Sequence, residues 1–146
     1  MISAMRPAIT GLRAATTSLA VSASNIVNMR DSGNLANAQV SAADRVRENA
    51  SQPKPTEDLY RPLRTDNVTI ASGGVRAVVQ HTDPPHVADY DPSDPNADDD
   101  GLVARPNVDL AAELVNMRQA KTMYSANLKV VRTADDMMGV LLDSKV

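Results

Sequence analysis

The sequence has no cysteine, phenylalanine or tryptophan, and its aromatic residues are three tyrosines. Without cysteine, the chain cannot form disulfides, thiolate metal sites or a cysteine nucleophile. Any core must be built from Leu, Ile, Val, Met and Ala, and this composition favours helices over sheets, whose strands normally draw on aromatic residues. With 146 residues, 42% of them hydrophobic, the chain fits one ordinary domain.

Long apolar runs are also missing. No stretch of about 18 apolar residues occurs, and polar residues such as Arg6, Thr10 and Arg13 interrupt the first twenty positions. We therefore expect no transmembrane span and no cleaved signal peptide.

The charge is small overall and unevenly spread. The net charge is −3, and clustered Lys and Arg, which a nucleic-acid surface requires, are not found. The segment from Asp83 to Asp100 holds seven aspartates and no basic residue, whereas the rest of the chain carries 15 basic and 11 acidic residues. We expect no nucleic-acid partner, and one short acidic segment sets the sign of the whole chain.

Apolar residues near the N-terminus recur at alternating steps of three and four, the spacing of a helix that packs lengthwise on another helix. Because Pro7 and Gly11 weaken the first turns, the spacing predicts a helix over about Ala8–Met29. A second face of this helix is small, polar and almost uncharged, which predicts close contact with neighbours. The apolar positions are Ile2, Met5, Ile9, Leu12, Thr16, Leu19, Ala23 and Ile26, and the polar ones are Ser18, Ser22, Ser24, Asn25 and Asn28.

The C-terminal segment repeats this pattern over a longer stretch and predicts a helix over about Asp109–Leu142, capped by Asn107 or Asp109. At 1.5 Å per residue it would be about 50 Å long, so its apolar seam needs a partner. The N-terminal helix is the only one that the sequence supplies. The seam consists of Leu110, Leu114, Met117, Tyr124, Leu128, Val131, Met138 and Leu142.

The region between the helices has different signals. Three prolines in residues 51–66 indicate an extended linker. Beyond it, two β-like runs flank a Ser-Gly-Gly turn and predict a hairpin, and two more short runs flank the acidic loop. The runs are Val68–Ala71 and Val75–Gln80 around Ser72–Gly74, then Val87–Tyr90 and Leu102–Arg105.

These elements predict a mainly α fold. Long N- and C-terminal helices pair as an antiparallel-type coiled coil, and a small middle region contains the β-hairpin. The expected division is a helical coiled-coil domain from residues 1–33 and 107–146, a linker at 34–66 and a small β-rich, acidic loop region at 67–106.

Residues that could carry chemistry are few. His81 and His86 lie beside Asp83 with no helical register to hold them on one side of an ion, so we expect solvated loop histidines. Gly73 and Gly74 match no phosphate-loop spacing and are expected to be turn glycines.

The acidic loop partly matches a calcium-binding loop. Asn96, Asp98, Asp100 and Gly101 occupy positions 1, 3, 5 and 6 of an EF-hand, but position 12 is Asn107 instead of the bidentate Glu. We expect a solvated acidic turn, with weak calcium binding as the alternative. We therefore predict no catalytic, cofactor-binding or metal-binding residue, no cofactor, and no enzyme activity.

Short motifs follow one another in a specific order through the second half of the chain. A Tyr-Ser-Ala-Asn-Leu segment at 124–128 follows them, and Gly11, Leu12, Asn25, Ile26 and Asn28 form a further pattern near the N-terminus. The motifs are GVR at Gly74, Val75 and Arg76, DPP at Asp83, Pro84 and Pro85, YDP at Tyr90, Asp91 and Pro92, and PNVD at Pro106, Asn107, Val108 and Asp109. The sequence resembles the flagellar basal-body rod family of axial rod and hook proteins, and its motifs are those of a proximal-rod member.

The resemblance implies a structural axial subunit that polymerises helically in the rod across the periplasm, transmits torque and supports motility. It also implies export through the flagellar type III apparatus without a cleaved signal peptide. The partners of the chain would be further copies of it and other rod subunits, and it would have no small-molecule substrate. Two alternatives stay open: a soluble two-helix adaptor or export chaperone, and a divergent rod paralogue of a second flagellar system.

Three sets of residues are expected to matter. Helix packing within the subunit is assigned to Leu12, Leu19, Ile26, Leu114, Met117, Tyr124, Leu128, Val131, Met138 and Leu142. Contacts between subunits are assigned to Asn25, Asn28 and Asn127. The residues that carry the family motifs are Gly74, Val75, Arg76, Tyr90, Asp91, Pro92, Pro106, Asn107, Val108 and Asp109.

Overall fold

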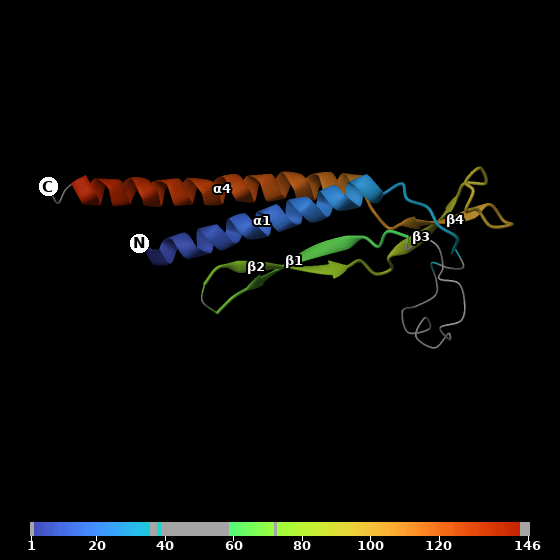
Figure 1. Ribbon diagram of the computed structural model, residues 1–146, viewed down its shortest axis with the longest axis horizontal. Coiled ribbons are helices and arrows are strands. Elements are labelled where there is room, and N and C mark those ends of the chain that lie inside the picture. Colours follow the sequence, from blue (N-terminus) through green and yellow to red (C-terminus); the bar gives the residue numbers. More distant parts are fainter. Residues whose placement is uncertain (1, 36–37, 39–58, 72, 144–146) are drawn as a thin grey trace. The chain divides into compact units, whose positions relative to one another are not determined.

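The computed structural model describes residues 2–35, 38, 59–71 and 73–143 (Figure 1). Within these residues two long helices enclose four strands in the chain order. The elements are α1 (Ile2–Asn28), β1 (Leu63–Thr69), β2 (Val75–His81), β3 (His86–Tyr90), β4 (Leu102–Pro106) and α4 (Leu110–Asp143). The expected mainly α fold with a small β middle region is therefore confirmed.

The chain divides into two compact units that interleave along the sequence. The first, here called the helical unit, comprises Met1–Ser24, Leu63–Gln80 and Asp109–Val146. The second, here called the tip unit, comprises Asn25–Pro62 and His81–Val108. The first hairpin thus groups with the helices, whereas the sequence placed it with the acidic loop. β1 already begins at Leu63, inside the expected linker, most of which lies outside the described residues.

Helix α1 begins earlier than the sequence indicated. It includes Pro7, although the predicted start was Ala8. Because proline lacks an N–H, α1 loses the one hydrogen bond that position 7 would donate to the Ser3 carbonyl, and the rest of this 27-residue helix is unaffected. The predicted start at Ala8 is wrong by six residues, and the end at Asn28 agrees within one.

The face of α1 that is buried is the one with small residues. Ala8, Gly11, Ala14 and Ala15 are buried in the helical unit, and Ile9 in the apolar seam is 40% exposed. Small side chains let another backbone approach closely, which large ones prevent. The heptad spacing therefore located the helix correctly but did not identify its most buried face.

Helix α4 lies alongside α1 and runs in the opposite direction (Figure 1). The side chain of Asn127 lies directly over Gly11, where an added Cβ would come within 2.6 Å of Asn127 Nδ2. On α1, the Ser18 hydroxyl also bonds to Thr65 of β1 at 3.2 Å. The small polar face, expected to contact neighbouring subunits, is thus used partly within the chain itself.

The β1–β2 hairpin is closed by glycines and held against α1. Gly73 and Gly74 have positive φ angles of 83° and 100°, which L side chains rarely adopt. The backbone N–H of Val75 donates to Thr10 Oγ1 at 3.2 Å, and a Cβ on Gly74 would lie 3.2 Å from Pro7 Cα. The predicted hairpin and its turn are confirmed, and Gly74 additionally allows the turn to approach α1.

In the tip unit, β3 and β4 form an antiparallel pair with His86 opposite Pro106 and Tyr90 opposite Leu102. Gly33 pairs with Ala104 from the other edge, through two backbone hydrogen bonds of 3.0 and 2.8 Å. Val103 and Ala104 have no exposed surface. Since successive strand residues point to opposite faces, both faces of β4 are covered, and this strand forms the core of the unit.

Helix α4 begins and ends where the sequence predicted, within one residue at each end. Asp109 caps it, because its Oδ1 accepts the backbone N–H groups of Ala111 at 2.8 Å and Ala112 at 3.2 Å. Of the two predicted caps, Asp109 is therefore the one used. In the part of the chain that the structure describes, neither helix is long and apolar enough to cross a membrane.

Candidate functional site

An open groove lies between α1 and α4 in the helical unit. Its volume is about 730 Å³, and four of the predicted packing residues, Leu19, Leu114, Met117 and Tyr124, line it together. Leu114 is 52% exposed and Tyr124 40%, so the groove is not sealed from solvent. The other lining residues are Ala15, Thr16, Val115, Arg118, Ala120 and Lys121.

The remaining predicted packing residues are only partly covered. Leu12, Leu128, Val131 and Met138 are half-buried on their helices, and Ile26 is half-buried in the last turns of α1. The side chain of Leu142 lies outside those that the structure describes. Their packing against one another stays a prediction.

Helix α4 presents many large hydrophobic side chains to solvent along its whole length. A helix on the surface of a soluble monomer normally carries a polar outer face, and contiguous exposed apolar surface marks an interaction site. This exposed set, each member at least 40% exposed, consists of Leu110, Leu114, Val115, Tyr124, Val130, Met137, Val140 and Leu141. Such a helix is suited to association.

Two of the asparagines expected at subunit contacts face the chain's own interior. Asn25 is 1% exposed, and its Oδ1 accepts a 2.8 Å hydrogen bond from the Tyr60 hydroxyl. Asn127 lies against Gly11 and donates to the Met123 carbonyl at 2.8 Å. For these two the structure gives contacts inside the chain, and for the half-buried Asn28 the assignment stays a prediction.

The aspartate of the YDP motif, Asp91, holds the following loop through an ion pair and a hydrogen bond. Asp91 Oδ2 lies 2.7 Å from Arg105 Nη2, and Asp91 Oδ1 accepts the Ser93 hydroxyl at 2.6 Å. Asp89 Oδ2 also lies 2.8 Å from Arg105 Nε, an ion pair whose angle does not make it a hydrogen bond. Arg105, outside the predicted site set, is thus the centre of this loop, and no periodicity could have revealed it.

The EF-hand-like residues form a turn that uses its carboxylates internally. Asp98 Oδ1 accepts the backbone N–H groups of Asp100 at 3.0 Å and Leu102 at 2.8 Å. Gly101 has a φ of 77°, and an added Cβ would lie 3.0 Å from the Tyr90 ring. This arrangement explains the aspartate and glycine spacing as an Asx turn.

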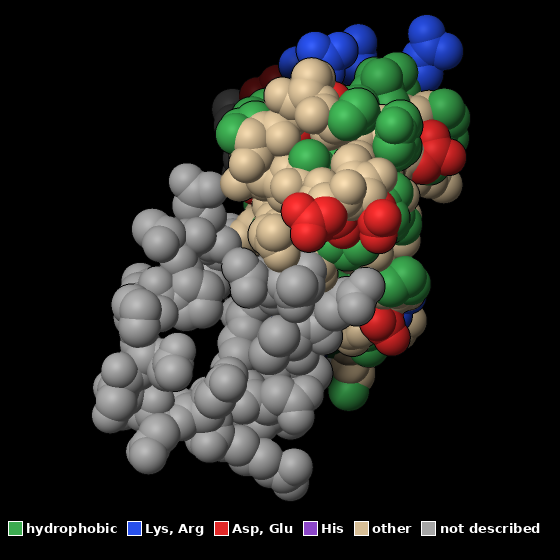
Figure 2. All heavy atoms as spheres, turned by 90° about the vertical axis from the view of Figure 1, so that its right-hand side faces the viewer, with side chains coloured by type: hydrophobic (Ala, Val, Ile, Leu, Met, Phe, Trp, Pro, Cys, Tyr) green, Lys and Arg blue, Asp and Glu red, His purple; other side chains and the backbone are tan. Residues whose placement is uncertain are grey.

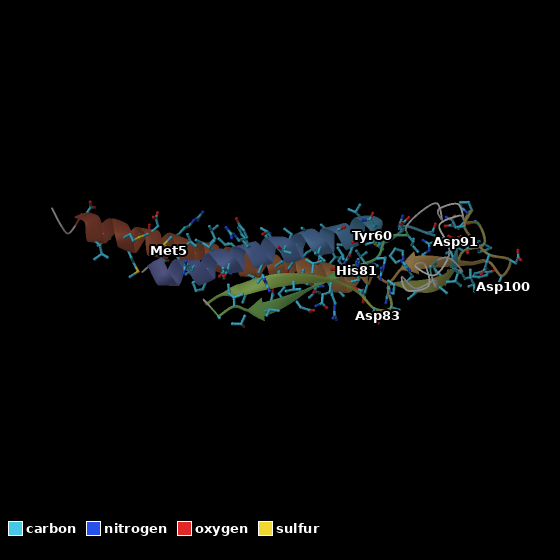
Figure 3. The ribbon with its side chains drawn as sticks, turned by 60° about the horizontal axis from the view of Figure 1, so that its bottom comes forward. Met5, Tyr60, His81, Asp83, Asp91 and Asp100 are labelled. Carbon is cyan, nitrogen blue, oxygen red and sulfur yellow. The ribbon has the colours of Figure 1, made fainter. Side chains whose placement is uncertain are left out.

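Asp94 also accepts hydrogen bonds within the acidic loop. The backbone N–H of Asn96 bonds to it at 2.9 Å, and this bond, with a second from the Ser32 side chain, lowers the pKa of Asp94. Figure 3 shows Asp91 and Asp100 at the end of the tip unit, away from His81 and Asp83. Across the described ranges, no group of three His, Asp or Glu side chains is placed to hold a metal ion.

The sequence indicated that the two histidines lie in a loop, but both lie in strands. His81 is the last residue of β2, and His86 is the first residue of β3. His86 Nε2 lies 3.2 Å from the Tyr60 carbonyl oxygen. The proline segment between them is the actual loop, and the expectation failed because the strands extend one residue further than their apolar pattern.

The PNVD motif joins this proline segment to the start of α4. The Asn107 backbone N–H donates to the Pro85 carbonyl at 2.9 Å, and Asn107 Nδ2 donates to the Pro84 carbonyl at 3.0 Å. Two residues later Asp109 caps the helix. The motif residues with described contacts therefore shape the backbone. Two of the residues that they or the predicted asparagines bond to were missed by sequence reasoning: Thr10, which accepts from Val75, and Tyr60, which donates to Asn25.

Part of the sequence matches a known protein family. Residues 100–144 match the family described as flagellar basal body rod FlgEFG protein, C-terminal. This segment contains most of β4 and nearly all of α4. The resemblance to flagellar basal-body rod proteins that the motifs indicated is therefore confirmed over this part of the chain.

Curated relatives make the likeness more specific, because the chain is similar to flagellar basal-body rod proteins FlgC from several bacteria. The chain is 42% identical to the one from Salmonella typhimurium over 69 residues, 47% of this chain and 52% of that protein. It is 42% identical to the Agrobacterium fabrum protein over 57 residues, 39% of this chain and 41% of the relative. For Aquifex aeolicus the identity is 50% over 40 residues, 27% of this chain and 30% of the relative. The chain spans about half the length of the first two relatives.

Proposed function

We propose that this chain is a structural axial subunit of the flagellar basal-body rod, polymerising in the proximal rod and transmitting torque. The observation that carries the proposal is the set of large apolar side chains that α4 exposes on more than one side between Leu110 and Leu141. These residues fall inside the segment that matches the rod C-terminal family. Apolar side chains are costly for a monomer to expose, and assembly of subunits would cover them.

The physical mechanism is mechanical rather than catalytic. Contacts between unlike surfaces of identical subunits build open helical filaments, which is the symmetry that a rod needs. The open groove at Leu19, Leu114 and Tyr124 supports the same proposal, because a neighbouring subunit would cover apolar surface that the single chain leaves half-exposed. The partners would be further copies of the chain, other rod subunits and the flagellar type III export apparatus. The location would be the basal-body rod across the periplasm.

The first test combines localisation with motility. A tagged chain is expected in purified flagellar basal bodies, and its deletion is expected to abolish swimming until the gene is restored. Absence from basal bodies together with intact swimming would contradict the proposal. A purified chain that is stably helical, monomeric and absent from basal bodies would favour an adaptor or chaperone.

A pair of variants separates assembly from folding. Val140→Asp places a charge among the exposed apolar side chains Val130 and Met137, where Val140 is 69% exposed, so the isolated chain should keep its helix content. Burying that charge between subunits costs several kcal/mol, so we expect loss of basal-body incorporation. Ser125→Asp adds the same charge at an exposed position of α4 whose neighbours on the helix, Lys129 and Arg132, are charged, and it should incorporate normally.

A further inference from the structure

Charge is separated between the two units of the chain. The tip unit carries 12 acidic and six basic residues, and its segment His81–Val108 holds seven of the acidic ones and only Arg105 of the basic ones. The helical unit carries nine basic and six acidic residues. Opposite charges on two surfaces steer them together and suppress wrong pairings. The two units therefore carry net charges of opposite sign.

The groove of the helical unit has both an apolar floor and a basic rim. Leu19, Met117 and Tyr124 provide apolar surface, and Arg118 and Lys121 are exposed beside them. Neither of these cations forms an ion pair with another residue in the described ranges. A ligand that fits this groove must present apolar surface flanked by negative charge.

The end of the tip unit, where β3 meets the acidic loop, presents both apolar surface and negative charge. Tyr90 is 69% exposed, and its ring lies over Gly101, next to the exposed aspartates Asp99 and Asp100. Figure 2 looks onto this end and shows acidic side chains beside hydrophobic ones. Exposed tyrosines are typical anchors of protein interfaces.

The loop that follows Tyr90 is held together by contacts of its own side chains. Arg105 clamps Asp91, and Asp98 accepts two backbone N–H groups of the acidic turn. A surface held in one conformation loses less entropy on binding than a flexible one. The tip therefore has the properties of a preformed ligand.

We propose that the tip of one copy, Tyr90 with Asp99 and Asp100, docks into the α1–α4 groove of a second copy. The tyrosine ring would pack on Leu19 and Met117, and the carboxylates would face Arg118 and Lys121. The inference rests on the proposed function, because it names a neighbour that a rod subunit would contact. Since tip and groove are different surfaces, this contact propagates from copy to copy without closing on itself.

The absence of cysteine allows a clean cross-linking test on the full chain. One purified copy carries Ala97→Cys, beside the docking residues of the tip, and a second, distinguishable by mass, carries Thr16→Cys in the groove. After mild oxidation we expect the mixed disulfide dimer in at least about tenfold higher yield than with a Thr133→Cys partner, because a docked pair raises effective concentration. Yields equal to the Thr133→Cys control would overturn the inference.

Charge reversal tests the proposed pairing more specifically. Lys121→Glu in the groove copy should lower the cross-linking yield about fivefold, near the upper end for one exposed charge pair. Asp100→Lys in the tip copy should restore it. Circular dichroism of each variant shows whether it keeps the helix content of the wild type, so that a lower yield can be distinguished from unfolding. A yield insensitive to both reversals would contradict docking by these residues.

Two further readouts separate the possible failures. A chain that carries both cysteines should form intermolecular products that increase with concentration, and a concentration-independent internal disulfide would contradict contact between copies. If the wild-type chain is found in basal bodies and the cross-link does not form, the tip contact is wrong and the proposed function stands. If the chain is absent from basal bodies, the function fails, and cross-linking of the purified chains still decides the contact.

Discussion

The hydroxyl of Tyr60 donates a 2.8 Å hydrogen bond to Oδ1 of Asn25, and Asn25 is 1% exposed. The bond joins the last turn of α1 to the chain just before β1. It gives the buried amide oxygen a partner, which buried polar groups require. An asparagine whose type and spacing indicate a subunit contact thus fastens the tip unit internally.

Removing the hydroxyl measures this bond. Tyr60→Phe should lower the free energy of unfolding by about 1–2 kcal/mol, because Asn25 Oδ1 loses a donor while staying buried. Urea denaturation followed by circular dichroism gives the value. Tyr124→Phe is the control, since Tyr124 is 40% exposed and should change stability by less than about 0.5 kcal/mol. Equal effects of the two substitutions would show that the bond is not important.

Two glycines in helices should respond in opposite directions. Gly11→Ala should destabilise the chain by about 1–3 kcal/mol, because the new Cβ would lie 2.6 Å from Asn127 Nδ2. Gly139→Ala should stabilise α4 by about 0.5–1 kcal/mol, since nothing lies within 4 Å and alanine favours helices. Thermal unfolding compares both with the wild type. If Asn127→Ala fails to rescue Gly11→Ala, the predicted clash is not the cause.

The hairpin turn provides a test of the motif glycine. Gly73 and Gly74 both have positive φ, so alanine at either position introduces strain. A Cβ on Gly74 would also collide with Thr10, whereas one on Gly73 touches only Pro7 at 4.0 Å. Gly74→Ala should therefore cost at least about 1 kcal/mol more than Gly73→Ala in chemical denaturation. A smaller cost at Gly74 would mean that the turn does not pack on α1.

The acidic loop should make part of the chain's stability depend on pH. Hydrogen bonds from Asn96 and Ser32 lower the pKa of Asp94 from its usual 3.8, so its charged form stabilises the fold above that pH. This contribution is lost as the pH falls through the lowered pKa. Asp94→Asn should therefore be less stable than wild type at about pH 6, with the difference shrinking as the pH falls below 3.8 and through the lowered pKa of Asp94. Denaturation midpoints across this range test it, with Asp99→Asn as the exposed control, and a difference independent of pH would contradict it.

Local patterns in the sequence predicted the elements well because local interactions determine them. The three-and-four spacing located both helices, the two glycines located the hairpin turn, and Asp109 was one of two candidates for the helix cap. The two β-like runs beside the acidic loop became β3 and β4 almost residue for residue. The start of α1 was missed because one proline removes only one hydrogen bond from a long helix. The start of β1 was missed as well, since this strand begins at Leu63, before the apolar run Val68–Ala71.

The motif residues illustrate a second limit. Their order was enough to indicate the flagellar rod family, yet their physical roles depend on partners far away in the sequence. Asn107 bonds to the carbonyls of Pro84 and Pro85, and Arg105 pairs with Asp89 and Asp91. No periodicity relates such positions, so a sequence can show that they matter without showing why.

The sequence by itself determined where the helices and strands lie, the lack of thiol chemistry and the concentration of acid in one loop. Tertiary structure alone decided which face of α1 is buried, because close approach of Asn127 at Gly11 depends on shape and not on hydrophobicity. It also decided that Asn25 points inward and that Leu19, Leu114, Met117 and Tyr124 surround an open groove. Packing of two elements depends on both partners at once, and the pattern of one helix describes only one of them.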